Sequence, residues 1–284
     1  MDVLSDVLRR MPVQGSVTGE LELHRPWGLE SPASDGGIFH IILRGSGYLD
    51  CGGKAEPFEA GDVILFPNGT AHRVSDEPGG KSVGFDRFLE TASVTEPNEQ
   101  RACRLYRGGG DGPVTVIICG TFSFGPDAGF LRSNLPDVIL LSGSDPFAMT
   151  WLEQPVRLLT HEVRCSRPGA QIAIDRIVDL IFVQGVRTWL ETGPRTGYGW
   201  LSAGADPQIG LAVKLIHADP FRDWKVGGLA GKVGMSRSAF SERFSRLVGE
   251  PPLRYVTRWR ITLAGQMMRE QPNKSVSAIS HEIG

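Results

Sequence analysis

The sequence predicts an α+β protein whose first half is a β-domain and whose second half is helical. Three observations carry this prediction. Residues 15–141 alternate short apolar runs with Gly, Pro, Asp and Asn, apolar residues recur at helical spacing after Pro155, and basic residues concentrate near the C-terminus. Short strands between frequent turns favour an antiparallel sandwich or barrel. A period of about 3.6 residues favours helices instead.

The distribution of charge says more than its total. The 284 residues carry 30 Lys+Arg and 32 Asp+Glu, for a formal net charge of −2. Segment 221–284 holds 11 basic and 5 acidic residues, which leaves 19 basic and 27 acidic residues before it. The total therefore combines about −8 with about +6, an asymmetry typical of a polyanion-binding end on an acidic body.

Several classes of protein are disfavoured by composition. The acidic N-terminus lacks an apolar core and is not a secretory signal. The most apolar stretch, 172–190, contains Asp175, Arg176, Asp179 and Arg187, so we expect no membrane span. The four cysteines form no C-x-x-C pair, which favours reduced thiols in a cytoplasmic protein over a disulfide framework or a zinc module.

The β-region is predicted from individual runs of β-branched and aromatic residues. Each run ends at Gly, Pro or Asn, as strands in an antiparallel domain do. The predicted strands cover residues 39–43, 48–51, 62–66, 114–119 and 121–124.

A helical connector is predicted next. Ile174, Ile177, Val178, Ile181 and Phe182 open a broad apolar face that continues to Leu190. That face could pack on the β-domain or against a second copy of the chain, and the sequence leaves both open. The Gly- and Pro-rich segment 193–199 is the strongest domain boundary. We therefore expect domains at 1–153 and 206–284, joined by the connector 154–205.

The C-terminal region is predicted to be helical from Pro207, with a stop at Asp219-Pro220. Within 224–249, a short helix leads to Gly234 at a tight turn, and Ser236 can cap a second helix with Phe240, Phe244 and Leu247 inward. This arrangement is typical of a helix-turn-helix, whose second helix enters the major groove of DNA. A plain helical hairpin with a solvated charged face is the alternative.

A third, basic helix follows Pro252, and the segment from Ser275 repeats the first half of the motif. The string 224–284 resembles the DNA-binding domain of the AraC/XylS family, through Leu229-Ala230, the turn 234–240, Leu247-Val248-Gly249, Tyr255 and Arg258-Trp259-Arg260. The resemblance implies two helix-turn-helix units that bind double-stranded DNA. Because the sequence stops at Gly284, we expect the second unit to be incomplete at its C-terminus.

The expected DNA-binding residues fall into two groups. By resemblance, Ser238, Ser241 and Glu242 face base edges. Arg237 on the same outer face can also meet base edges, and Ser236 caps the helix. The other basic residues are suited to phosphates, and they are Arg243, Arg246, Arg258 and Arg260.

The N-terminal half resembles the cupin-type sensor domain of many AraC-like regulators. Segment 61–72 fits G-x5-P-x-G-x2-H, the second cupin motif, whereas His40 has no further His or Glu close behind it. The resemblance implies a cupin-like β-barrel whose four-ligand metal site is incomplete. His40 and His72, with Cys119 or Cys51, could still bind a zinc-like ion, or could be ordinary buried residues.

A small-molecule effector is compatible with either interpretation of the histidines. Its expected contacts are apolar and aromatic side chains of the barrel together with one histidine. They are Phe39, Ile41, Tyr48, Phe66, His72 and Phe122.

Two functions follow from the sequence. In the first, the chain is a ligand-responsive, DNA-binding transcription regulator of the bacterial cytoplasm, whose connector relays the signal or forms a homodimer. In the second, it is a metal-dependent cupin enzyme, a dioxygenase or isomerase, with an accessory helical tail. The incomplete ligand set and the absence of an acid/base pair beside it favour the first, which is not an enzyme.

Overall fold

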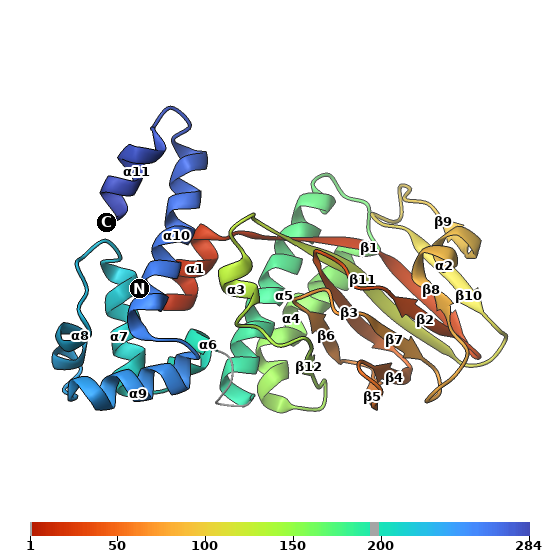
Figure 1. The fold of residues 1–284 in the computed structure, drawn as a ribbon. Coiled ribbons are helices and arrows are strands. Elements are labelled where there is room, and N and C mark those ends of the chain that lie inside the picture. Colours follow the sequence, from red (N-terminus) through yellow and green to blue (C-terminus); the bar gives the residue numbers. More distant parts are fainter. Residues whose placement is uncertain (1, 194–198) are drawn as a thin grey trace. The chain divides into compact units, whose positions relative to one another are not determined.

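The computed structural model describes residues 2–193 and 199–284 and divides into two compact units. The β unit comprises Val13–Ser123 and Pro136–Glu191, and the helical unit comprises Met1–Pro12, Phe124–Leu135 and Thr192–Gly284. The expected order of a β-domain followed by helices is present (Figure 1). The expected domain limits differ from these units, because two short segments from the first half of the chain, Met1–Pro12 and Phe124–Leu135, group with the C-terminal helices. Among the described residues, no helix combines the length and apolar character needed to cross a membrane.

The β unit contains two sheets. The strand order is β12-β6-β3-β11-β1-β10-β9 in the seven-stranded sheet and β5-β4-β7-β2-β8 in the five-stranded sheet. The strands are β1 (Val13–His24), β2 (Gly28–Ser31), β3 (Gly37–Arg44), β4 (Ser46–Asp50), β5 (Ala55–Glu59), β6 (Val63–Phe66), β7 (His72–Ser75), β8 (Val83–Gly84), β9 (Ser93–Thr95), β10 (Leu105–Gly109), β11 (Val114–Phe124) and β12 (Ile139–Leu141).

The core of the β unit lies between the two sheets. Ile42, Ile64 and Phe66 from the larger sheet cluster with Leu49 and Val74 from the smaller one. The two separate strand orders describe facing sheets and not one closed barrel. The predicted runs 114–119 and 121–124 form one continuous strand, β11, which pairs antiparallel with β3.

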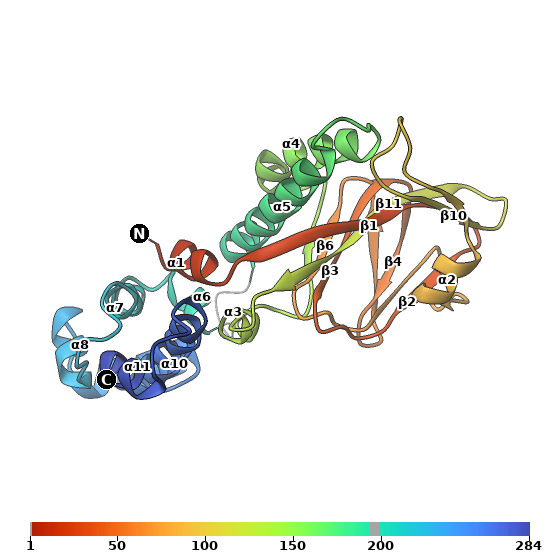
Figure 2. The same ribbon diagram turned by 90° about the horizontal axis from the view of Figure 1, so that it is seen from above.

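The other face of the seven-stranded sheet is covered by α4 (Pro146–Val163) and α5 (Ala170–Thr192), as Figure 2 shows. Phe122 of β11 packs between Phe39 of β3, at 5.1 Å between ring centroids, and Phe182 of α5, at 4.9 Å. The connector helix predicted from the spacing of Ile174 to Leu190 is therefore confirmed as α5. Helix α4 begins at Pro146, earlier than the start at Pro155 that the helical spacing of apolar residues indicated. Asp145 caps this earlier start, and Pro155 lies inside the helix.

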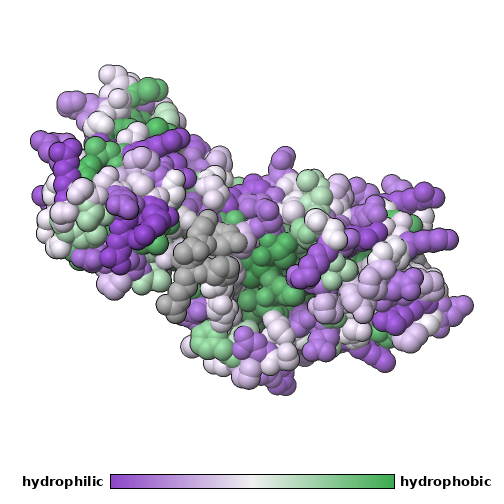
Figure 3. Space-filling view, turned by 60° about the horizontal axis from the view of Figure 1, so that its bottom comes forward, coloured by the Kyte–Doolittle hydropathy of each residue, from purple (hydrophilic) through white to green (hydrophobic). Residues whose placement is uncertain are grey.

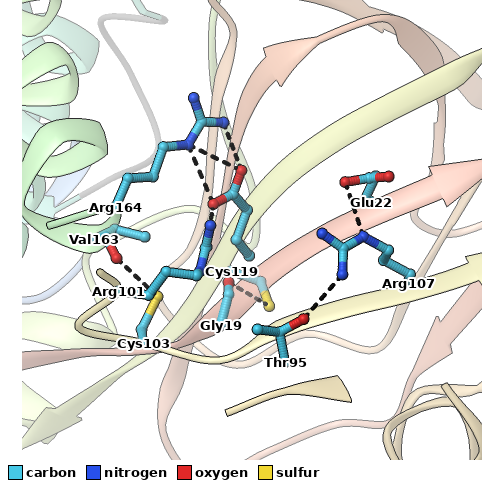
Figure 4. Close-up of polar contacts among 10 residues, drawn as sticks. Gly19, Glu22, Thr95, Arg101, Cys103, Arg107, Cys119, Val163 and Arg164 are labelled. Carbon is cyan, nitrogen blue, oxygen red and sulfur yellow. Dashed lines mark hydrogen bonds and ion pairs between the residues drawn. The ribbon is translucent and has the colours of Figure 1, made fainter. Parts of the chain in front are cut away.

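A buried ion cluster joins β1 to the end of α4. Glu20, 4% exposed, accepts hydrogen bonds from Arg101 at 2.6 Å and from Arg164 at 2.5 Å (Figure 4). Burial raises the pKa of Glu20, but Arg164 and Arg101 lower it more, so the pKa lies below its ordinary value. Cys103 and Cys119 are buried nearby (Figure 4), and burial raises their pKa values to about 11 and about 12.

The helical unit combines segments that are distant in sequence. Its helices are α1 (Val3–Arg10), α3 (Gly129–Arg132), α6 (Gly199–Ala203), α7 (Pro207–Ala218), α8 (Val226–Lys232), α9 (Arg237–Val248), α10 (Pro252–Glu270) and α11 (Val276–Ile283). Helix α2 (Phe85–Thr91) belongs to the β unit, as α4 and α5 do. The predicted stop at Asp219 and the helix start at Pro207 are confirmed.

A buried polar network ties α1 to α7 and α10. His217 lies 3.1 Å from the Asp6 carboxylate through Nδ1 and 2.8 Å from the Tyr255 hydroxyl through Nε2. Burial lowers the pKa of His217 despite the neighbouring carboxylate, so we assign a neutral ring that donates to Asp6 and accepts from Tyr255. Phe130 of α3 packs on Trp259 of α10 at 4.8 Å. These contacts explain why the N-terminal helix belongs to the helical unit.

Candidate nucleic-acid interface and sensor interior

The helix-turn-helix predicted at 224–249 is present as α8, a turn and α9. Gly234 has a φ of 70°, a left-handed conformation that favours glycine at the turn. Ser236 caps α9 by accepting a hydrogen bond from the amide of Ala239 at 3.3 Å. Phe240 and Phe244 are fully buried, and Val248 completes the inner face where Leu247 was expected. The sequence therefore builds a capped helix with one face held by the unit's core.

The opposite face of α9 is open to solvent. Arg237, Ser238, Glu242 and Arg246 are exposed, and Ser241 is half-buried among them. Within residues 2–193 and 199–284, Arg237, Glu242 and Arg246 form no ion pair. Their side chains are thus available to an external partner, with short hydroxyls between longer charged groups.

Arg243, expected on phosphates, has partners within the helical unit. Its guanidinium forms an ion pair with Asp206 at 2.6 Å and donates to the side chain of Gln208 at 3.2 Å. Burial raises the pKa of Asp206, but the amide of Ile209 and the guanidinium of Arg243 outweigh it, so the pKa is lowered. Arg243 therefore fixes α9 to the start of α7.

Arg258 and Arg260 of α10 also have internal partners. Arg258 pairs with Glu250 at 2.6 Å, and its guanidinium lies 4.7 Å from the centre of the Phe130 ring. Arg260 donates to the carbonyls of Pro220 and Arg222, each at 2.8 Å. Both side chains therefore already have partners within the unit, and these contacts connect α10 to its neighbouring parts.

Other exposed cations lie outside the residues that the sequence assigned individually to DNA. Lys232 at the end of α8 is exposed, and the side chain of Arg254 at the start of α10 is 79% exposed, 3.9 Å from Glu250. Residue type alone does not separate them from the three paired arginines. Their exposure, visible only in the folded unit, makes them better candidates for phosphate contacts.

In the β unit, His40 and His72 form a direct pair. Their Nε2 atoms lie 2.8 Å apart, and Nδ1 of His72 lies 2.8 Å from the carbonyl of Thr70. Because a carbonyl only accepts, His72 carries its proton on Nδ1, and Nε2 of His40 donates to His72. Burial lowers the pKa of both rings, and for His40 the neighbouring His72 adds to the effect. Both rings are therefore neutral at pH 7.

This geometry does not form the expected metal site. When two imidazole nitrogens bind one zinc ion, each nitrogen lies about 2.0–2.1 Å from the metal and carries no proton. The hydrogen bond between the two Nε2 atoms needs a proton on one of them. Cys119 directs its thiol at the carbonyl of Gly19, at 3.6 Å, and its raised pKa keeps it protonated. Cys51 is only half-buried and faces the carbonyl of Ala71. Among the described residues, no group of three His, Cys, Asp or Glu side chains could hold a metal ion.

The expected effector contacts are divided between different surfaces. Phe66 and His72 stack at 3.7 Å between the two sheets. Phe39, Ile41 and Phe122 are buried on the opposite face of the larger sheet, where Phe122 meets α5. Tyr48 lies on the face of β4 opposite the buried Leu49. The six residues do not line one pocket, because neighbouring positions of a strand face opposite sides of the sheet.

Comparison with known proteins agrees with this architecture. Residues 2–191 match a family described as Cupin, and residues 229–284 match one described as Helix-turn-helix domain. A protein of Streptomyces lividans described as an AraC-like transcription regulator is 31% identical, with 100% of this chain and 90% of that protein covered. A Streptomyces antibioticus protein of the same description is 30% identical, with 100% and 91% covered. The transcriptional regulator AlkR of Acinetobacter baylyi is 26% identical, with 100% and 92% covered.

The cupin match extends over more than half of the chain and contains the paired sheets of the β unit. The helix-turn-helix match contains α9 and its open face. The predicted combination of a cupin-like domain with a helix-turn-helix region is therefore confirmed. The chain belongs to the family of AraC-like transcription regulators.

Proposed function

We propose that this regulator binds double-stranded DNA with α9 in the major groove and that a small molecule bound in the β unit controls this binding. The open face of α9 is the observation that carries the proposal. A capped helix whose inner face is buried, and whose outer charges have no partner in the described chain, meets the requirements of a recognition helix.

Roles within this face follow from side-chain chemistry. Ser238, Ser241 and Glu242 are short enough or suitably polar to meet base edges, and Glu242 can accept from a cytosine amino group. Arg237 and Arg246 suit phosphates at either end of the helix, and Lys232 and Arg254 extend this basic border. Ser236 acts through its cap on α9 and not through DNA.

Binding can be tested by fluorescence anisotropy on a duplex taken from the region upstream of the chain's own gene. We expect salt-dependent binding that the double variant Arg237→Glu/Arg246→Glu abolishes. The matched control Lys54→Glu/Arg104→Glu makes the same change of net charge at exposed sites of the β unit, where Lys54 is 84% exposed. Equal loss of binding in the control, or no loss in the first variant, would count against the proposed interface.

The covalent path between the units suggests how a signal passes. Strand β1 begins directly after the α1 segment, and β11 ends directly before the α3 segment. These two strands contribute to one sheet, while α1 and α3 belong to the helical unit. We infer that ligand-dependent shifts of β1 and β11 bias the arrangement of α1 and α3, which requires different effector affinities in the two states.

A homodimer is the assembly that the surface of α4 and α5 favours. Phe147, Trp151 and Leu158 lie on α4 with 43–50% of each exposed, and Leu180 of α5 is 44% exposed. Figure 3 shows a hydrophobic area that is exposed at the surface of the molecule. Exposed apolar residues of this kind are typical of protein interfaces. Sedimentation velocity should report a dimer that Trp151→Glu/Leu158→Glu dissociates, while Leu253→Glu, at a position of α10 that is 43% exposed, leaves it intact.

We infer further that the chain acts in the cytoplasm, where its DNA target lies, and that it is not an enzyme. A metal-dependent cupin enzyme would need a ligand set that the His40–His72 pair does not supply. A turnover screen with added Fe(II), Mn(II) or Zn(II) tests this point. Metal-dependent turnover by the wild-type chain that is lost in His72→Ala would support the enzyme.

A further inference from the structure

The helical unit contains a groove where the end of α3 meets the corner between α9 and α10. The groove has a volume of about 420 Å³, and every segment that lines it belongs to the helical unit. This volume falls within the range of about 300–1,000 Å³ usual for small-molecule sites. Its charged and hydroxyl-bearing lining residues, among those that the structure describes, are Ser133, Arg246, Glu250, Arg254 and Arg258.

The charges that line the groove do not balance. Three arginines and one glutamate give the described lining a net charge of +2. Arg258 pairs with Glu250 at 2.6 Å, and Arg254 lies 3.9 Å from the same carboxylate. Arg246 forms no ion pair within residues 2–193 and 199–284. Because positive charges that share one groove repel each other, the groove favours an anionic occupant.

The guanidinium groups are accessible to such an occupant. The side chain of Arg254 is 79% exposed and that of Arg258 is 35% exposed, and Arg246 is also exposed. Glu250 is only 12% exposed and keeps Arg258, and more loosely Arg254, at the groove. Guanidinium groups form strong, often bidentate hydrogen bonds with phosphate and carboxylate oxygens.

Ser133 adds a neutral donor beside the arginines. Its hydroxyl oxygen accepts a hydrogen bond from the side-chain amide of Asn134 at 3.1 Å and lies 3.4 Å from Nη1 of Arg258. The carbonyl of Phe130 is 3.5 Å away, which is long for an O–H···O bond of usually about 2.5–3.0 Å. The hydroxyl hydrogen is therefore available to an oxygen atom of an occupant.

We propose that this groove binds the phosphate group of a small phosphate monoester. Such a group carries about −1.5 to −2 charges at pH 7, which matches the net charge of the groove, and it offers three oxygens to the arginines and the hydroxyl. A phosphodiester of the DNA backbone carries a single charge and matches it less well. The site is separate from the sensor of the β unit and goes beyond the function proposed above.

The test compares the monoester with the diester, because Arg246 and Arg254 also belong to the basic border proposed for DNA. The full, isotope-labelled chain is titrated with methyl phosphate and with dimethyl phosphate in about 0.1 M sodium chloride, and the NMR shifts of the Ser133 and Arg254 amides report on the groove. Methyl phosphate should give saturable shifts with a Kd of about 1 mM or below. Dimethyl phosphate, with one charge, should bind at least about fivefold more weakly.

Two variants change the groove in opposite directions. Arg254→Gln removes an exposed donor and should weaken methyl phosphate binding about three- to tenfold. Glu250→Gln removes the competing carboxylate and should tighten the binding about threefold or more, a gain that partial unfolding does not imitate. Arg104→Gln and Glu96→Gln make the same changes in an exposed ion pair of the β unit and should leave the affinity unchanged.

Each measurement can contradict the proposal. It is overturned if methyl phosphate does not saturate, if Arg254→Gln has no effect, or if Glu250→Gln fails to tighten binding. Equally tight binding of dimethyl phosphate would also overturn it and would assign the groove to phosphates of the DNA backbone.

The groove and the DNA interface can fail separately, because the titration needs no DNA. Saturable methyl phosphate binding with the expected variant pattern, in a chain that does not bind DNA, would overturn the proposed function and leave the groove as an anion site. Salt-dependent DNA binding without saturable methyl phosphate binding would overturn the groove and leave the DNA interface intact.

Discussion

Arg243 and Arg246 lie three positions apart on α9, and the structure gives them different tasks. Arg243 pairs with Asp206 at 2.6 Å, whereas Arg246 is exposed and has no ion pair among residues 2–193 and 199–284. Glutamine in place of each arginine removes the same charge. We therefore predict that Arg243→Gln lowers stability and that Arg246→Gln lowers DNA affinity.

The magnitude for Arg243→Gln follows from what Asp206 retains. The side chain of Arg243 is 38% exposed, so solvent screens the pair. The carboxylate keeps hydrogen bonds from the amides of Gln208 at 3.0 Å and Ile209 at 2.9 Å. Because the charge is not left without partners, we expect a loss of about 1–2 kcal/mol in the free energy of unfolding of the helical unit.

The magnitude for Arg246→Gln follows from counterion release. One phosphate contact fewer reduces the slope of log K against log salt by about 0.9, which corresponds to about eightfold weaker binding at about 0.1 M salt. An exposed side chain without an intramolecular partner changes stability by less than about 0.5 kcal/mol. Arg246→Gln should therefore unfold like the wild type.

The assay combines anisotropy at several salt concentrations with hydrogen exchange of α7 and α9 amides in urea. Exchange is needed because tryptophans occur in both units, at Trp27, Trp151 and Trp189 and at Trp200, Trp224 and Trp259. If Arg243→Gln reduced the salt slope and left exchange unchanged, the pair with Asp206 would not be its role. If Arg246→Gln left both the DNA affinity and its salt slope unchanged, α9 would not bind DNA as proposed.

Four further predictions test the folded units. Burial lowers the pKa of His40 and His72 below the unfolded value of about 6.5, so the unfolded chain binds more protons. Stability should therefore fall as the pH drops below about 6.5. Hydrogen exchange of β3 amides should show this fall, and His40→Leu/His72→Leu should remove it. Gly120→Ala should destabilise the β unit by about 1–3 kcal/mol, since its Cβ would lie 2.1 Å from the carbonyl of Ser16, while Gly84→Ala, with open space around it, should not; equal urea midpoints would contradict this. Zinc added to chelator-treated protein should leave the unfolding midpoint of the β unit unchanged, because the histidines bond each other; a rise that His72→Ala removes would refute it. Ser236→Ala should cost α9 about 1 kcal/mol through loss of its cap, seen as faster exchange of the Ala239 amide.

Local patterns in the sequence were sufficient for much of the helical unit. Ser236 and Ser275 cap α9 and α11, Pro207 starts α7, and Gly234 adopts the left-handed turn. These features depend on neighbours within a few residues, so the chain order alone carries them. The same holds for the apolar period of α5, which recurs within one helix.

The interior of the β unit could be predicted only in part. Alternation along β3 indicates that Phe39 and His40 face opposite sides, but both are buried, so burial does not identify the side between the sheets. Packing of α5 on Phe122 decides this, and the residues of α5 lie about 60 positions later. A cavity of about 570 Å³ beside α2, lined by Leu23, Trp27 and Phe88 among others, was missed because its lining comes from strands and a helix that only the fold brings together.

The sequence by itself determined the family, the order of the two kinds of domain and the recognition helix, because motifs and periodicity are local properties. Only the tertiary structure decided which arginines are available to DNA and which are held within the unit. Arg243, Arg246, Arg258 and Arg260 are chemically identical in the sequence, and their partners Asp206, Glu250 and the carbonyl of Pro220 are selected by how the helices pack. A charge that is already paired within the folded unit has to share or lose that partner when it binds an external one, whereas the exposed Arg246 does not.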